Sequence, residues 1–436
     1  MPPVSMLSDQ ILQALRQRGG VLSSAELQAA LGASQPTVSR ALQPLVQAGI
    51  VRKTGAARSQ RYLLPRRIPD VGTEVPIMRI DEAGSAHSFA RLIPLEGGAH
   101  WVDEAAGVHQ RHDGLPWFLA DMRPQGFLGR TFANAHPELG QGNDPRQWND
   151  DDVLRALVMF GDDLPGNLIV GEPAFQRFHA LTERVTRAAS DGEYPALAER
   201  AMSGTLPGSS AGGEQPKFCV RVAGRHVLVK FSPAGPSPVD QRVRDLLVCE
   251  HLALQTLGDA GLPVARSRIV VRAGRVFLES ERFDRTAAGR IGMVSLLAYD
   301  SEYIGDIDNW AATARRMDSR RLLRPADADQ LRLLEAYGVL IGNTDRHYGN
   351  ISLLIEGDDW VLSPTYDMLP MLYAPIGGEL VAQDFASRAP KPTSDTLDQW
   401  PAALALARSF WTAAASDDRI SADFRAIAMA NRAVLG

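Results

Sequence analysis

Two short segments late in the chain carry the residue types that phosphoryl transfer needs. Asp345 and Asn350 are five residues apart, and Asp367 follows seventeen residues after Asn350, across an apolar strand-like run and a turn. In phosphotransferases, an aspartate in the first position accepts the proton of the attacking hydroxyl, while the asparagine and second aspartate hold Mg²⁺ against the nucleotide phosphates. The spacing therefore predicts Asp345 as the catalytic residue and Asn350 and Asp367 as metal ligands.

The same polar residues have a plainer interpretation, because Asn343, Asp345 and Asn350 could simply cap turns. However, nine consecutive residues, 342–350, carry six polar side chains between an apolar helix and an apolar strand. A run of polar residues between two core elements favours a functional site over simple turn caps. His347 is a second candidate for catalysis there, although a neutral histidine bonded to the backbone is the commoner role.

A kinase also needs a loop that covers the phosphates and a lysine that grips them. The glycine-rich stretch 207–217 is the loop candidate because its glycines let backbone N–H groups approach phosphate, although it matches neither the P-loop nor the GxGxxG pattern. Lys230 lies within an apolar strand, where a buried ammonium is costly without an anion. Glu250, on the next long helix, is its natural ion partner. A mobile surface loop, an edge-strand lysine and a solvated glutamate are the alternatives.

Length, composition and charge exclude several other classes of protein. The 436 residues exceed one ordinary core, and 45% hydrophobic with 22% charged residues is typical of globular domains. A net charge of −5 means that any contact with nucleic acid must be local. Cys219 and Cys249 lie in apolar surroundings, which predicts buried thiols and excludes a disulfide framework. We expect a soluble cytoplasmic protein, because no apolar run is long enough to span a membrane and no signal peptide pattern is present.

Residues 1–66 predict a winged helix-turn-helix. Ser8 is expected to cap a first helix, Ser23 and Glu26 to form the capping box of a second, and Pro36 to open a third with one polar face. Two basic strands around a turn follow, as a wing would. The residues predicted to contact DNA are Gln35, Thr37, Ser39 and Arg40 for base edges and Arg52, Lys53, Arg58 and Arg61 for phosphates. A protein-interaction module is the alternative.

At these motifs the chain resembles the HipA family of serine/threonine kinases, the toxins of bacterial toxin–antitoxin persistence modules. It is most similar to the YjjJ-like branch, which carries its own helix-turn-helix. The matching segments are 212–218, 229–230, Glu250 with 261–264, 281–285, 343–350 and 365–370. The resemblance spans roughly residues 75–400, and its motifs are specific together but not singly.

The resemblance implies ATP and Mg²⁺ as cofactors and assigns the nucleotide contacts. The residues implied for phosphates are Gly212, Gly213, Glu214, Gln215, Pro216, Lys217 and Lys230; those for adenine are Glu281, Arg282 and Phe283; and His347, Tyr348, Gly349, Asn350, Tyr366 and Asp367 complete the site. The resemblance also implies that a serine of the phosphate loop phosphorylates itself and swings out. Ser210 matches that serine, with Ser209 adjacent, and phosphorylation there adds about two negative charges beside a phosphate site.

The expected fold is α+β: an N-terminal winged helix-turn-helix followed by a two-lobed, protein-kinase-like (HipA-like) fold with a β-rich N-lobe and a helical C-lobe. The predicted domains are the winged helix-turn-helix at 1–66, a HipA-like amino-terminal subdomain at 67–205, the N-lobe with the phosphate loop at 206–286, and the C-lobe with the catalytic motifs at 287–436.

The resemblance implies a growth-inhibiting protein kinase, and the family's substrates include aminoacyl-tRNA synthetases. HipA kinases usually meet DNA through a separate antitoxin, whereas here residues 1–66 supply a helix-turn-helix in cis. Half-site recognition normally requires a dimer, so a homodimer is expected. Two alternatives stay open: a transcription regulator whose kinase-like domain senses a nucleotide, and a small-molecule kinase.

Overall fold

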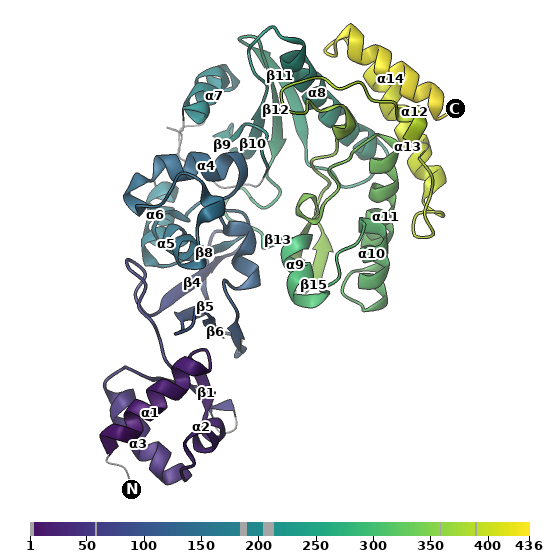
Figure 1. The fold of residues 1–436 in the computed structure, drawn as a ribbon. Helices are drawn as coiled ribbons and strands as arrows, with labels where there is room; N and C mark the ends of the chain where they lie inside the picture. The colour runs from purple at the N-terminus through teal and green to yellow at the C-terminus, as the bar shows by residue number, and fades with distance from the viewer. Residues whose placement is uncertain (1–3, 57–58, 184–189, 204–212, 358, 389) are drawn as a thin grey trace.

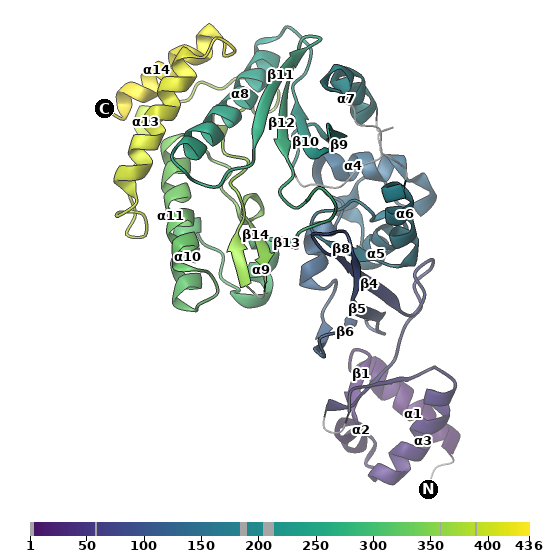
Figure 2. The same cartoon turned by 180° about the vertical axis from the view of Figure 1, so that it is seen from behind.

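Residues 4–56, 59–183, 190–203, 213–357, 359–388 and 390–436 are described by the structure, which is a computed structural model. The chain runs from a small helical module at one end, through a middle sheet with its helices, to two larger lobes at the other (Figure 1). The two termini therefore lie at opposite ends of the molecule, as the reverse view also shows (Figure 2).

The N-terminal module has the predicted helix-turn-helix with a wing. Its elements are α1 (Val4–Gln17), β1 (Val21–Ser23), α2 (Ser24–Leu31), α3 (Gln35–Gln47), β2 (Arg52–Thr54) and β3 (Arg61–Leu63), with sheet order β1-β3-β2. The capping box of α2 is present, with Ser23 and Glu26 bonded reciprocally. The expectation for Ser8 is wrong: α1 already begins at Val4, and the buried Ser8 hydroxyl donates to the Ala41 carbonyl at 3.0 Å. Ser8 thus ties α1 to α3 instead of starting a helix.

A five-stranded antiparallel sheet forms the middle of the molecule. Its strands are β4 (Val75–Ile80), β5 (Ala86–Pro94), β6 (His100–Glu104), β7 (His109–His112) and β8 (Leu168–Val170), in the order β7-β6-β5-β4-β8. The helices α4 (Gly126–Ala135), α5 (Asp150–Phe160) and α6 (Glu172–Glu183) accompany it, with 3₁₀ turns at Trp117–Met122, Pro137–Leu139 and Pro145–Gln147. Leu154 and Leu157 of α5 share an apolar core with Ile77 and Leu92 of the sheet.

The next sheet has four antiparallel strands and a long helix on one face. The strands are β9 (Lys217–Val222), β10 (Arg225–Phe231), β11 (Ser267–Arg272) and β12 (Arg275–Glu281), in the order β11-β12-β10-β9, and α8 (Pro238–Asp259) is the helix. On the other face, Tyr194 of α7 (Tyr194–Met202), which follows a 3₁₀ turn at Asp191–Glu193, packs with Phe218, Phe231 and Phe277. This is the expected β-rich lobe, and α7 packs on it although it precedes residue 206.

The last part of the chain is mainly helical, as expected. It contains α9 (Leu296–Tyr303), α10 (Trp310–Ser319), α11 (Pro325–Leu340), α12 (Phe385–Arg388), α13 (Trp400–Ser416) and α14 (Ala422–Val434), a small sheet of β13 (Met293–Ser295), β14 (Ser352–Glu356) and β15 (Asp359–Leu362), and 3₁₀ turns at Tyr348–Asn350 and Met371–Tyr373. Its core continues into α8, so the two lobes share one apolar cluster. Among the described residues, no helix is both long and apolar enough to cross a membrane. Cys249 is a buried thiol and Cys219 a half-buried one.

Candidate active site

A buried ion cluster lies where the β-rich lobe meets the helical lobe. Lys230 of β10 faces α8, because its strand neighbours Val229 and Phe231 point into the core on the opposite face. Its Nζ atom is 2.7 and 2.8 Å from the two carboxylate oxygens of Glu250 on α8, and it also pairs with Asp367. Burial alone would lower the pKa of Lys230, but the charges of Asp367 and Glu250 outweigh it and raise that pKa. The ammonium therefore stays charged at neutral pH.

The two carboxylates of this cluster differ. Burial raises the pKa of the Glu250 carboxyl against the opposing charge of Lys230. Burial also acts on Asp367, but Lys230 and Lys217 outweigh it and hold the pKa of that carboxyl below its usual range. Asp367 also has a φ of 56°, a left-handed conformation that costs about 1–3 kcal/mol for a residue with a side chain. That strain fits a residue whose carboxylate must point in one direction.

The segment that carries Asp345 is fixed through its backbone. The Asp345 N–H donates to the buried Asn343 side chain at 3.0 Å, and the Asp345 carbonyl accepts from the Asn350 amide at 2.8 Å. Arg346 donates to the Asn343 carbonyl and, at 3.1 Å, to Glu335 of α11. The Asp345 side chain itself is 52% exposed. Its carboxylate is therefore held in place and open to an incoming hydroxyl.

Asn350 and Asp367 together fit a magnesium ion shared with a nucleotide. Because the Asn350 Nδ2 atom is used by the Asp345 carbonyl, its Oδ1 atom is left as the metal-ligating end. In the described ranges no three His, Cys, Asp or Glu side chains gather as a metal site. Mg²⁺ is commonly held by one or two side-chain oxygens, with phosphates and waters completing the octahedron. The donor set fits that kind of site and not an all-protein metal cage.

Part of the predicted phosphate loop can be placed. Ser209, Ser210 and Gly212 lie outside the described residues. Gly213 has a φ of 94°, and its carbonyl accepts from the Phe127 N–H at the start of α4 at 3.0 Å. A Cβ atom on Gly213 would lie 2.8 Å from the Lys217 Nζ atom, so only glycine fits beside that ammonium.

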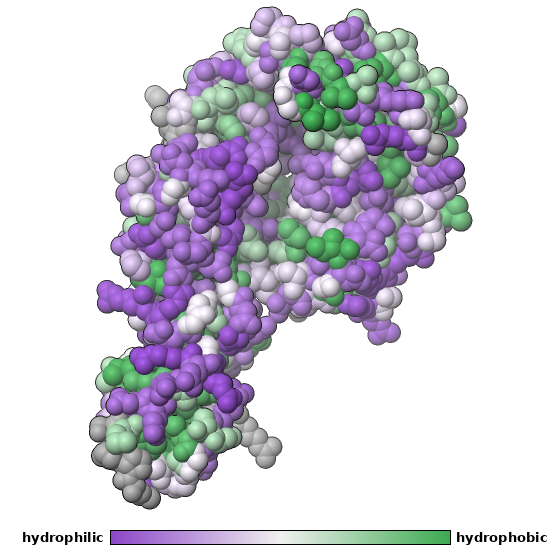
Figure 3. Space-filling model, viewed as in Figure 1, coloured by the Kyte–Doolittle hydropathy of each residue, from purple (hydrophilic) through white to green (hydrophobic). Residues whose placement is uncertain are grey.

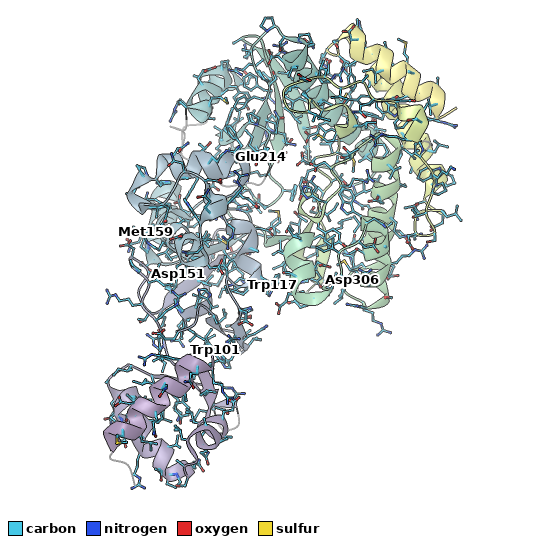
Figure 4. All side chains as sticks on the ribbon, in the orientation of Figure 1. Trp101, Trp117, Asp151, Met159, Glu214 and Asp306 are labelled. Carbon is cyan, nitrogen blue, oxygen red and sulfur yellow. The ribbon has the colours of Figure 1, made fainter. Side chains whose placement is uncertain are left out.

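The neighbouring loop residues have separate roles. Glu214 pairs with Arg130 of α4 at 2.6 Å, and Figure 4 shows it beside that helix. The Gln215 amide donates to the Phe231 carbonyl at 2.9 Å, and the Pro216 carbonyl accepts from the Phe231 N–H at 3.0 Å. These contacts anchor the loop end to α4 and β10. They leave phosphate contact to the loop backbone and Lys217.

Lys217 lies directly opposite Lys230 in the β9–β10 pairing. It is buried, and burial lowers its pKa to about 8, with Asp367 opposing that shift and Lys230 adding to it. Two lysines thus lie beside the carboxylate of Asp367. An incoming phosphate would add negative charge beside Lys217 and so extend the pH range over which this lysine stays protonated.

The segment expected to hold adenine lies between the lobes. The Glu281 N–H donates to the Arg266 carbonyl at 2.8 Å and the Arg282 N–H to the His226 carbonyl at 2.9 Å. The Phe283 ring lies 5.5 Å from the Tyr366 ring, so these two aromatic side chains lie side by side.

Arg282 does not extend its side chain toward a nucleotide. Its guanidinium is buried and pairs with Asp284 at 3.0 Å and with Asp163 at 3.2 Å. Arg285 pairs with the same two carboxylates, each at 2.8 Å. The sequence analysis missed this ion cluster, because Asp163 comes from the loop before β8, more than a hundred residues earlier. The alternating charges of 281–285 were its only local signal.

The three residues before Asn350, His347, Tyr348 and Gly349, mostly support the loop. His347 accepts the Gly349 N–H on Nδ1 at 3.0 Å, and its Nε2 atom lies 3.7 Å from Asp345. The Tyr348 side chain is buried, and its hydroxyl accepts from the Asp308 N–H at 2.7 Å. The Gly349 carbonyl accepts from the Tyr366 hydroxyl at 3.1 Å. Tyr348 therefore packs in the helical lobe and leaves only its backbone for a nucleotide.

The predicted DNA-contacting residues divide into two groups. On α3, Gln35, Ser39 and Arg40 are exposed and Thr37 is half-buried, which gives one polar helix face open to a groove. On the wing, Lys53 is exposed and Arg61 is half-buried, whereas Arg52 pairs with Glu74, which lies just before β4. Arg58 lies outside the described residues. Arg52 is thus occupied by a carboxylate of its own chain.

Three family models match separate parts of the chain. Residues 10–55 match the IclR helix-turn-helix domain, 71–179 the middle domain of YjjJ-like toxins, and 209–431 the HipA-like C-terminal domain. Toxin YjjJ of Escherichia coli K12 is 38% identical over 442 residues, covering 98% of this chain and 96% of that protein.

The fold is also found in a solved structure. HipA of Shewanella oneidensis MR-1, determined with HipB and operator DNA, superposes with a TM-score of 0.50 at 13% identity, over 82% of this chain and 95% of that one. At this identity the likeness concerns the fold alone. Together with the motif matches and the full-length relative, it shows that the chain belongs to the HipA-like toxin family, in its YjjJ-like branch with a fused N-terminal helix-turn-helix.

Proposed function

We propose that this protein is an ATP- and Mg²⁺-dependent protein kinase that phosphorylates serine or threonine and inhibits growth as a toxin. The observation that carries the proposal is the bridge from Lys230 to both Glu250 and Asp367, beside a backbone-fixed and exposed Asp345. That combination provides a phosphate grip, a metal ligand and a base at one junction. A protein that only sensed a nucleotide would have no use for an exposed aspartate next to the metal ligand.

Each residue has one role in the proposed transfer. Lys230 and Lys217 bind phosphate oxygens, and Asn350 and Asp367 present oxygens to Mg²⁺, which when bound offsets the negative charge that accumulates on the phosphates. Phe283 and Tyr366 pack against adenine. Asp345 orients the substrate hydroxyl and accepts its proton as the oxygen attacks the γ-phosphorus, with ADP as the leaving group. Figure 3 shows the hollow between the middle segment and the helical lobe, through which a protein surface would approach.

Phosphate transfer from labelled ATP with Mg²⁺ tests this proposal, with and without cell lysate. Asp345→Asn keeps the shape of the side chain and removes the base, so it should bind ATP normally and lose at least about 100-fold in transfer. Asp418→Asn, at a fully exposed carboxylate that pairs only with Arg425 in the described structure, is the matched control. Transfer in neither wild type nor control, with intact ATP binding, would reject the kinase and leave a nucleotide-sensing regulator or a small-molecule kinase.

The proposal includes autophosphorylation at Ser210 or Ser209, in the glycine-rich loop that ends at the ion-paired site. A phosphate there would compete with ATP for Lys217 and Lys230. Mass spectrometry after incubation with ATP would reveal it, and the absence of phosphate on both serines would reject this part alone. An aminoacyl-tRNA synthetase is the proposed class of protein substrate.

We also propose that the N-terminal module binds DNA in cis as part of a homodimer, without requiring a separate DNA-binding antitoxin. The exposed polar face of α3 supports this, as does the operator DNA in the solved HipA complex. Arg40→Ala should weaken binding to the cognate genomic fragment about 5- to 100-fold, and Arg16→Ala on α1 serves as its control. Binding that responds to neither Arg40 nor added salt would contradict the proposal.

A further inference from the structure

A pocket of about 360 Å³ lies against the segment that carries Asp345. It is lined by Val339, Gly342, Asn343, Thr344, Arg346, Leu372, Phe385, Arg388 and Pro390. Three parts of the chain build it: the end of α11, the residues around Asp345, and the segment that follows Asp367. No role in nucleotide binding falls to any of these residues, so the pocket is a separate feature of the site.

The wall of the pocket is held in place by backbone contacts. The Gly342 carbonyl accepts from the Leu372 N–H at 2.9 Å. Gly342 has a φ of 75°, and a Cβ atom there would lie 3.4 Å from the Leu372 Cβ atom, so the two segments touch closely. Val339, Leu372 and Phe385 make the inner surface apolar. A preformed apolar pocket of this size holds one large side chain.

The rim of the pocket is positively charged. Arg346 is already paired with Glu335 and bonded to the Asn343 carbonyl, whereas Arg388 is exposed on α12 and pairs with no carboxylate among the described residues. The described lining residues include these two arginines and no carboxylate. Arginine pairs favourably with carboxylates, so the rim favours an acidic group beside the apolar one.

The position of the pocket relates it to the reaction. Thr344 and Arg346, the residues on either side of Asp345, both line it. A substrate segment whose hydroxyl reaches Asp345 advances roughly 3.3 Å per residue, so a residue within about three positions of the hydroxyl reaches the pocket. The pocket therefore lies where a protein substrate would place a neighbouring side chain.

We propose that this pocket selects the protein substrate, by taking up a large apolar side chain close to the phosphoacceptor while the exposed Arg388 at its rim binds an acidic residue beside it. This inference rests on the proposed kinase function. It names the kind of sequence that the enzyme phosphorylates: a serine or threonine followed or preceded, within about three residues, by a large apolar and an acidic side chain.

A positional-scanning library of serine and threonine peptides, used with labelled ATP, tests the selection directly. Wild type should favour a large apolar residue at one position and an acidic one near it, each by about tenfold. Arg388→Glu, at an exposed side chain, should replace the acidic preference with a basic one and leave the apolar preference unchanged. Arg320→Glu, at an exposed arginine in the same lobe, should leave both preferences as in wild type.

The outcomes separate the pocket from the kinase. Peptide phosphorylation with no positional preference, or with an acidic preference that Arg388→Glu does not alter, would contradict the proposed role of the pocket. It would not contradict the proposed kinase activity. Labelling of lysate proteins but of no peptide would also contradict the role of the pocket, as would labelling of the enzyme alone, which would assign the pocket to a segment of its own chain. No transfer to any acceptor overturns both proposals.

Discussion

At the scale of single residues, the site holds two buried lysines whose pKa values are shifted in opposite directions. Lys230 and Lys217 face each other across two paired strands, yet the pKa of Lys230 is raised and that of Lys217 is lowered to about 8. At Lys230 the charges of Asp367 and Glu250 outweigh burial, whereas at Lys217 burial and the charge of Lys230 outweigh the opposing charge of Asp367. Lys217 is therefore the residue whose charge a nucleotide would change.

ATP affinity should accordingly depend on pH through Lys217. Below pH 8 this lysine is already an ammonium, whereas above pH 8 it is neutral and phosphate binding must recover a proton, so affinity should fall by up to about tenfold per pH unit. The dissociation constant of MgATP, measured from pH 7 to 9.5, reports this directly. Lys217→Arg cannot lose its charge and should flatten the profile, whereas Lys391→Arg, at an exposed lysine, should not. Equal slopes in all three proteins would contradict the assignment.

The residues around Asp345, the proposed catalytic residue, were within reach of sequence reasoning because they are close together in the chain. Asp345, Asn350 and Asp367 are separated only by short elements, and Lys230 stood out as a charge in an apolar strand. The supporting partner of Arg346 was not predictable in that way. Glu335 lies eleven residues earlier, on α11, and its local sequence gives no sign that it pairs with Arg346.

At the scale of elements, the segment after β12 is fastened to the middle of the molecule. Arg282 and Arg285 reach Asp163 in the loop before β8, and the Gly166 N–H donates to Asp284 at 3.0 Å. Burial opposes ionisation of Asp163, but Arg282, Arg285 and Arg290 together lower its pKa to about 2. The loop before β8 therefore holds in place residues 282–285, which connect the β-rich lobe to the helical lobe.

This ion cluster predicts a defined acid sensitivity. Because the pKa of Asp163 is lower in the folded protein, its stabilisation is complete above about pH 4 and is lost as the pH falls from 4 towards 2. Asp163→Asn should lower the melting temperature by a few degrees at pH 6 and by almost nothing at pH 2, since its carboxylate is 39% exposed and partly screened. Thermal unfolding at both pH values measures the difference. Asp113→Asn, at a strongly exposed carboxylate, is the control, and a pH-independent effect of Asp163→Asn would contradict the prediction.

Sequence patterns revealed the hairpins and long helices of this region unevenly. β9 with β10 and β11 with β12 are short runs rich in apolar and β-branched residues on either side of a glycine turn, which is the local signal of a hairpin. β7 escaped because its four residues, His109–His112, are mostly polar and form the edge of their sheet, where an inward apolar face is not required. α7 was missed because its packing partner is a sheet that comes later in the chain.

At the scale of the whole molecule, the helix-turn-helix is joined to the middle sheet by a small core. Leu63 of the wing packs with Ile93, Leu95 and Trp101, and Figure 4 shows Trp101 at the end of the middle segment nearest this module. The Thr54 hydroxyl donates to Asp103, whose carboxylate also accepts from Trp101. The wing is thus bonded to its own chain through apolar and polar contacts.

The ion pair between Arg52 and Glu74 should limit how the wing contacts DNA. Glu74→Gln removes the competing carboxylate and frees Arg52 for a phosphate, so affinity should rise and the slope of log K against log salt should steepen by about 1. Titrations over a range of salt concentrations measure this slope. Glu82→Gln, at an exposed glutamate of the middle segment, should leave it unchanged. A slope that Glu74→Gln does not alter would show that Arg52 stays off the DNA.

The core shared by Leu63, Ile93, Leu95 and Trp101 also sets the orientation of the N-terminal module relative to the middle sheet. Under the proposed DNA binding, this core would carry the orientation of α3 on the operator over to the kinase-like lobes. B-DNA turns through roughly 35° per base pair, so moving a half-site by one base pair would swing the catalytic lobes of one copy about the DNA axis by that angle. The spacing of half-sites would then determine whether the two active sites of a bound dimer face each other, face apart or face the same side.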